Sequence, residues 1–191
     1  MRSVRSTYAV RVRLVQRMRL LRDRRGVSAV EFGLILPTLI ALYLGIAETG
    51  NAITVYRRMS EVAATAADLT AQVKKVQTKD LEDIVSASSA ILSPYPTQPL
   101  KIVISSVVAD QYNNGKVAWS YSNKGSGRAV ESAYPVPAGL TEASSSVIVA
   151  EITYAFSPLV DLKTFFSPDS FNMTRTFYAR PRRSPTVTKT D

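Results

Sequence analysis

The feature that most constrains this chain is the apolar run of 21 residues from Val27 to Ala47, in which Glu31 is the only charge. As an α-helix, such a run spans about 31 Å, close to the hydrocarbon thickness of a bilayer. A secretory signal peptide has a shorter apolar region of about 7–15 residues, although residues 45–47 do resemble a small-x-small cleavage site. A buried helix of a soluble protein seldom follows so basic a leader. The run therefore predicts a transmembrane helix over residues 27–47.

The positive charge of the chain lies almost entirely before this helix. The formal net charge is +9, and residues 1–26 hold nine Arg and a single acid, Asp23. Because the rest is nearly neutral, a nucleic-acid partner is not expected. After the helix, Arg57 and Arg58 are the only cations within about twenty residues, so the positive-inside rule predicts a cytoplasmic leader and an extracytoplasmic body. Met18 is an alternative start within that leader.

The composition excludes most catalytic chemistry. The chain has no Cys and no His, which removes disulfides, thiolate nucleophiles, Ser-His-Asp catalysis and the common zinc sites. Residues 125–127 lack the Lys-Ser/Thr pattern of a phosphate loop. Glu131, Glu142 and Glu151 are interpreted as solvated acids, because nothing in the sequence brings them together. We therefore expect no enzymatic activity, no catalytic residue, no metal or cofactor, and no small-molecule substrate.

Apolar residues continue beyond the run at alternating spacings of three and four. No Pro interrupts this pattern, so the membrane helix is predicted to extend to about Lys75. The stripe favours packing against the chain's own domain, with a coiled-coil seam as the alternative. Its members are Ala52, Val55, Met59, Val62, Ala66, Leu69, Val73 and Val76.

A second helix and four strands are predicted after this stripe. Thr78 can cap the helix, and its apolar side is Leu81, Ile84, Val85, Ile91 and Leu92. Prolines at 94, 96 and 99 end the helical region. Alternating or β-branched patterns predict strands over 100–108, 116–122, 145–156 and 171–179, and Asn113-Asn114-Gly115 predicts a hairpin between the first two.

These elements predict an α+β fold in which a long helix lies across a small antiparallel sheet. The expected organisation is a leader (1–26), a transmembrane helix (27–47), an extracytoplasmic helical region (48–93) and a β domain with a basic tail (94–191). The aromatic residues expected to fill the core between sheet and helix are Trp119, Tyr121, Tyr154 and Phe156. The basic residues expected to be solvated, or else to contact a partner, are Arg175, Arg180, Arg182 and Arg183.

Two features of the predicted membrane helix are candidate functional sites. Intramembrane acids usually mark a function, and Glu31 lies one turn after Val27. Cleavage after Gly26 would create an α-amino group at Val27 that could neutralise Glu31 on the same chain or on a neighbour. The alternative is a protonated glutamic acid near the membrane surface. Small residues recur every four positions and could let another helix approach closely, although such residues are also common in membrane helices: Ala29, Gly33, Pro37, Ala41 and Gly45.

The segment Arg25-Gly26-Val27-Ser28-Ala29-Val30-Glu31-Phe32, followed by Leu34-Ile35-Leu36-Pro37, closely resembles the N-terminus of TadE-like proteins. These proteins are minor pilin-like, or pseudopilin, components of the tight-adherence (Tad) pilus, a relative of the type IV pilus. The strong resemblance covers about residues 24–67. It implies a pilin-like fold and cleavage between Gly26 and Val27 by a prepilin peptidase. It also makes Glu31 the fifth residue of the mature chain.

The resemblance implies a pilus assembly or structural component of the bacterial inner membrane. Its partners would be the inner membrane, the prepilin peptidase and other pilins, and after processing it would reach the pilus or the cell surface. The main alternative is a membrane-anchored periplasmic binding module that never enters a filament. That alternative predicts an intact Gly26–Val27 bond and no effect of Glu31→Ala.

Overall fold

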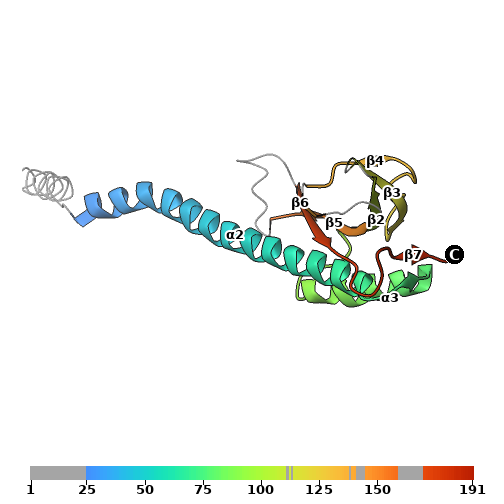
Figure 1. Ribbon diagram of the computed structural model, residues 1–191. Coiled ribbons are helices and arrows are strands. Elements are labelled where there is room, and N and C mark those ends of the chain that lie inside the picture. The colour runs from blue at the N-terminus through green and yellow to red at the C-terminus, as the bar shows by residue number, and fades with distance from the viewer. Residues whose placement is uncertain (1–24, 111, 113, 138, 141–144, 159–169) are drawn as a thin grey trace, which may run out of the picture. The chain divides into compact units, whose positions relative to one another are not determined.

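The computed structural model describes residues 25–110, 112, 114–137, 139–140, 145–158 and 170–191 (Figure 1). The chain divides into two compact units, Met1–Ala47 and Glu48–Asp191. From Arg25 onward the first unit is helical. The second unit, called the body below, combines helices with all the described strands.

Helix α2, Arg25–Ala71, is the longest element. The prediction of one continuous helix is confirmed, and Pro37 lies inside the helix without ending it. The helix ends at Ala71 rather than near Lys75. Its Ala71 carbonyl accepts the backbone N–H of Arg182 (2.9 Å), and Lys75 instead begins strand β1 (Lys75–Val76).

The apolar stripe of α2 packs against its own domain, which confirms that interpretation of its spacing. Val55, Met59 and Val62 are completely buried in the main hydrophobic core. Ala66 on the same side is also buried, and its small side chain lets the helix lie close to the residues it covers. This part of the helix is therefore a component of the body's core.

A second helix, α3 (Thr78–Ser89), is followed by the short 3₁₀ helix η1 (Ala90–Leu92). The prediction that Thr78 caps this helix is wrong, because its N-cap is Gln77. The backbone N–H of Thr78 donates instead to both side-chain oxygens of Asp191 (2.9 and 3.0 Å). The predicted apolar side is confirmed, with three residues fully buried or nearly so: Leu81, Val85 and Leu92.

The contact between Asp191 and α3 should make the stability of the body depend on pH. The hydrogen bond from the Thr78 N–H holds the pKa of the Asp191 carboxyl below its ordinary value, and a smaller contribution in the same direction comes from Lys189. A lowered folded-state pKa stabilises the fold above the ordinary pKa, and this stabilisation is lost as the pH falls through the lowered one. We expect Asp191→Ala to lower the melting temperature at neutral pH, with the difference from wild type vanishing in acid. Asp83→Ala, which removes an exposed carboxylate of α3, should show no such convergence in the same thermal scans.

Five antiparallel strands form the main sheet, in the order β4-β3-β2-β5-β6. All four predicted strands are present: β2 (Leu100–Ala109), β3 (Gly115–Ser122), β5 (Ser146–Phe156) and β6 (Phe171–Ala179). The predicted hairpin joins β2 to β3, although Asn113 itself lies outside the described residues. The two-residue strand β4 (Ala133–Tyr134) was not predicted, because it is too short to show an alternating pattern.

One face of the sheet and both helices share the main core, and the helices lie together on that side in Figure 1. Trp119, Tyr154 and Phe156 are buried in this core as predicted, and Tyr121 packs at its margin. The opposite face carries a smaller apolar cluster: Val107, Val117, Tyr134, Val147 and Val149. The predicted α+β class, with a long N-terminal helix packed on an antiparallel sheet, is thus confirmed.

The last residues of the chain are built into the body. Strand β7 (Thr188–Lys189) pairs in parallel with β1 to form a second, two-stranded sheet. Just before β7, the buried Val187 accepts a hydrogen bond from the indole Nε1 of Trp119 (2.8 Å). This segment therefore joins the main sheet to the start of α3.

Candidate functional site

The membrane-segment part of α2 presents its apolar side chains outward along its whole length. Among the described residues, α2 is the one helix long and apolar enough to cross a membrane. Val30, Leu34 and Leu42 are each at least 60% exposed. Side chains of this kind are stable outward only in lipid or against other apolar helices.

The predicted processing site and the intramembrane charge share the first turns of α2. Gly26 and Val27 are both helical and exposed, and the position of Gly26 has open space around it. Glu31 is also exposed and follows Val27 by four residues. On a helix, residues four apart are neighbours with Cβ atoms about 5–6 Å apart. An amine at Val27 and the Glu31 carboxylate would therefore be within reach of each other.

The small residues form a second feature of the same segment. All five are exposed, and a Cβ added at Gly33 or Gly45 would meet no other atom. Four residues advance an α-helix by one turn and about 40°, so these residues follow an inclined i±4 ridge and not a straight line. Glu31 stands two residues from a member of this ridge, about 200° around the axis. The carboxylate therefore lies on the side of the helix opposite the nearest members of the ridge, Ala29 and Gly33.

Pro37 adds a polar group to this ridge. Its nitrogen carries no hydrogen, so the carbonyl of Gly33 loses its normal partner within the helix. In a membrane, such a group must be satisfied by a neighbouring helix, a polar side chain or water.

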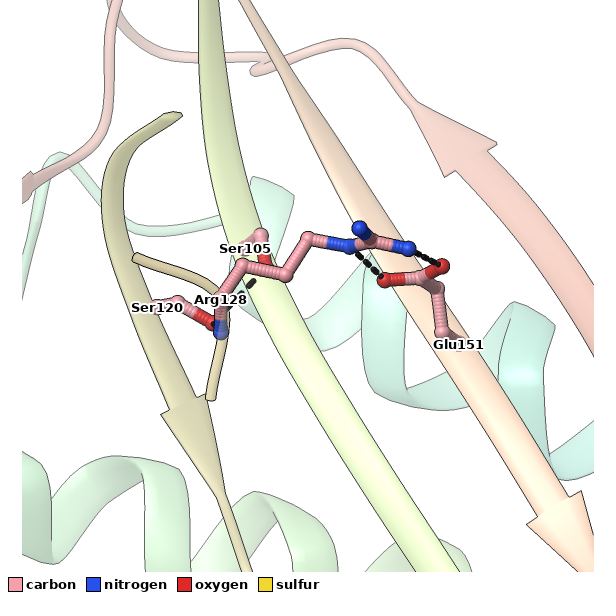
Figure 2. Close-up of polar contacts among 4 residues, drawn as sticks. All are labelled: Ser105, Ser120, Arg128 and Glu151. Atoms are coloured by element: carbon pink, nitrogen blue, oxygen red, sulfur yellow. Dashed lines mark hydrogen bonds and ion pairs between the residues drawn. The ribbon is translucent and has the colours of Figure 1, made fainter. Parts of the chain in front are cut away.

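A polar cluster lies on the sheet face opposite the helices (Figure 2). Arg128 Nε and Nη2 donate to the two carboxylate oxygens of Glu151 (2.6 and 2.5 Å), and the guanidinium lies 4.8 Å from the ring centroid of Tyr134. The Ser120 hydroxyl accepts the Arg128 backbone N–H (2.9 Å) and lies 2.9 Å from the Ser105 hydroxyl. The bonds with Glu151 raise the pKa of Arg128. We interpret these contacts as structural: they hold the connection between β3 and β4 against the sheet.

The three glutamates named as solvated acids have different environments. Glu131 is exposed, with Lys116 Nζ 3.9 Å away, as expected for a surface acid. The prediction is wrong for Glu151, whose carboxylate binds Arg128, and Glu142 lies outside the described residues. In the described part of the chain, no three His, Cys, Asp or Glu side chains gather in a way that could hold a metal ion.

The prediction of a solvated basic tail is also wrong in part. Arg175 donates to the hydroxyls of Ser60 (2.7 Å) and Tyr56 (3.0 Å), and its guanidinium lies 4.3 Å from the Tyr56 ring centroid. It therefore joins β6 to α2, because its position on the strand faces that helix. Two further arginines are engaged within the body: Arg182 pairs with Asp68, and Arg180 donates to the carbonyls of Gly139 and Leu140.

An apolar helix exposed along its length and followed by an α+β body defines a class: proteins held in a membrane by one N-terminal helix. Within that class, residues 26–68 match the family model described as TadE-like protein. The match confirms the resemblance over this segment of the chain. Comparisons with curated proteins and with solved structures find no match.

Proposed function

We propose that this chain is a minor pilin or pseudopilin of a bacterial type IVb (Tad) pilus, which acts in pilus assembly and structure. The observation that supports this most is the exposed apolar segment of α2, with its single carboxylate at Glu31, inside the TadE-like segment. Exposed apolar surface of this extent needs lipid before assembly and neighbouring helices after it. One segment can serve both states, as a subunit moving from membrane to filament requires.

The proposed processing step is cleavage between Gly26 and Val27 by a prepilin peptidase. Both residues are exposed at the start of α2. Cleavage removes the basic leader and leaves an ammonium group at Val27, one turn from Glu31. Pairing the two charges offsets the cost of placing either in an apolar surrounding. The nine Arg of the leader favour a cytoplasmic N-terminus, a periplasmic body and insertion in the inner membrane.

The two sides of the helix suggest how neighbours are arranged. Glu31 faces one side, and the nearest members of the small-residue ridge, Ala29 and Gly33, face the other. One partner helix cannot contact both at the same level. We therefore propose that the mature chain packs between two neighbours, one whose Val27 ammonium pairs with Glu31 across the contact and one that closely approaches the ridge. Contacts through two different sides extend an assembly, whereas a contact of one side with itself closes a dimer.

The first experiment is N-terminal sequencing of the membrane-associated protein from its native cells. We expect the mature chain to begin at Val27. A start at Met1 or Met18 would contradict processing and favour the periplasmic binding module. A start at Glu48 would instead identify residues 27–47 as a cleaved signal peptide.

The charge pair is tested by Glu31→Gln, which keeps the shape of the side chain and removes its charge. We expect normal cleavage but at least about tenfold less protein in the sheared pilus fraction, since leaving one member of a buried ion pair uncompensated costs several kcal/mol. Glu61→Gln, a change of an exposed acid later in α2, serves as the matched control and should incorporate normally. Equal incorporation of the Glu31 variant would rule out the charge pair.

A further inference from the structure

The connection between β2 and β3 ends in a chemically labile dipeptide, Asn114-Gly115, whose glycine is the first residue of β3. In such a pair the backbone nitrogen of Gly can attack the side-chain Cγ of Asn, because Gly has no side chain to obstruct the approach. The new N–Cγ bond closes a succinimide ring as the Cγ–Nδ2 bond breaks, and the amide nitrogen leaves as ammonia with the proton from the Gly nitrogen. Water then opens the ring to aspartate or isoaspartate.

Asp110 holds the asparagine of this pair by its backbone and its side chain. One carboxylate oxygen of Asp110 accepts the backbone N–H of Asn114 (2.8 Å), and the other accepts the side-chain Nδ2 (3.0 Å). The Asp110 backbone N–H also donates to the Asn114 carbonyl (3.0 Å). The same carboxylate accepts the backbone N–H of Tyr112 (2.8 Å). The three hydrogen bonds between Asp110 and Asn114 therefore fix the backbone and the side-chain amide of Asn114, which must rotate for the ring to close.

The attacking nitrogen is restrained as well. Gly115 is buried and lies opposite Ala109 in β2 and Tyr134 in β4. Ring closure would require this residue to leave its place between two strands. The side-chain amide of Asn114, in contrast, is at an exposed residue where water can enter.

We propose that Asn114 is a deamidation site and that the carboxylate of Asp110 restrains its reaction in the folded body. When the restraint is lost, Asn114 converts to aspartate or isoaspartate. The product places a second carboxylate beside Asp110 and loses the Nδ2 donor, so the two charges repel and the β2–β3 connection opens. Deamidation of Asn114 thus destabilises the contacts around Asp110, which are the contacts that slow deamidation in the folded body.

The restraint persists under the conditions in which deamidation is fastest. The backbone N–H of Asn114, followed by its side chain, holds the pKa of Asp110 below its ordinary value. The carboxylate therefore stays charged at neutral and alkaline pH and continues to accept all three N–H groups. The test can accordingly be run at mildly alkaline pH without protonating Asp110.

The experiment compares the full chain in detergent with its Asp110→Ala variant during incubation at mildly alkaline pH. Peptide mapping by mass spectrometry measures conversion of Asn114. We expect the variant to convert at least about fivefold faster, the factor that corresponds to one typical hydrogen bond. Asp83→Ala, a similar loss of one exposed carboxylate from α3, should react like wild type. Wild type unfolded in urea should also convert much faster than folded wild type.

Two results would overturn the proposal: equal conversion in wild type and Asp110→Ala, or conversion of folded wild type as fast as in urea. General unfolding of the variant is detected separately. Asn123 is held within the body by the backbone groups of Ile102 (2.8 Å) and Leu100 (3.3 Å). Amide exchange at Ile102 should therefore stay slow in the variant if only the β2–β3 connection has opened.

Discussion

Trp119→Ala is expected to lower the free energy of unfolding of the body by about 3–5 kcal/mol, the usual cost of emptying a large buried aromatic site. Trp119 is 7% exposed in the main core, and its indole donates to the Val187 carbonyl. The change therefore leaves a cavity and an unpaired buried carbonyl together. Since domains are stable by only about 5–15 kcal/mol, this is a large part of the total. Urea unfolding of the full chain in detergent, followed by circular dichroism, measures the effect.

Trp119→Phe keeps most of the ring and removes only the donor, so its expected cost is smaller, about 1–3 kcal/mol. It also gives a measurable value if Trp119→Ala does not fold. Tyr112→Ala removes an aromatic side chain that is 77% exposed and should change stability by less than about 0.5 kcal/mol. A Trp119→Ala variant as stable as Tyr112→Ala would contradict the described core.

Gly115→Ala is expected to destabilise the body by about 1–3 kcal/mol through overpacking. A Cβ at this position would lie 2.5 Å from the Tyr134 carbonyl oxygen and 2.9 Å from side-chain atoms of Val107 and Val136. The backbone oxygen cannot move without disturbing the pairing of β3 with β4. The single Trp of the chain, at 119, reports unfolding by its fluorescence.

Gly50→Ala is the matched control for this prediction. The same methyl group is added, but Gly50 lies inside α2 with no atom within 4 Å of the new Cβ. Replacing a helical Gly by Ala should stabilise by about 0.5–1 kcal/mol. The two substitutions are thus expected to have opposite signs, and destabilisation by both would show that the space around Gly115 is not the cause.

The long elements of this fold could be predicted from the sequence because their periodicity is local. The apolar run and the stripe beyond it define α2, and the strand that ends at Ala179 has the predicted bounds. Strands β1, β4 and β7 have two residues each, which is too few for any pattern. Their positions follow from pairing between distant segments, and so does the strand order.

The wrong predictions share this cause. The backbone N–H of Thr78, at the start of α3, donates to Asp191, which is 113 residues away in the sequence. The sequence predicts a solvated Arg175 because it does not show the partners of this residue. These partners, Tyr56 and Ser60, lie on a helix more than one hundred residues earlier. Charged and polar side chains find such partners only once the chain is folded, so composition does not reveal them.

The candidate membrane site is a different case. Gly26, Val27, Glu31 and the small-residue ridge were named from sequence because one regular helix fixes their relative positions. Whether the Gly26–Val27 bond is cut, and which helices contact the ridge, depends on other molecules. These points stay predictions for the experiments above.

The pairing of β7 with β1 has a consequence for how the body would acquire its structure if it is exported as proposed. With the proposed cytoplasmic N-terminus, the later part of α2 and the sheet strands would reach the far side before residues 187–191. Until then, Trp119 lacks its Val187 acceptor, β1 has no partner and α3 has no Asp191 at its first turn. The body should therefore remain incompletely closed during translocation and close when its last residues emerge. In that order of events, the body would remain incompletely folded while it crosses the membrane and would complete its fold only afterwards.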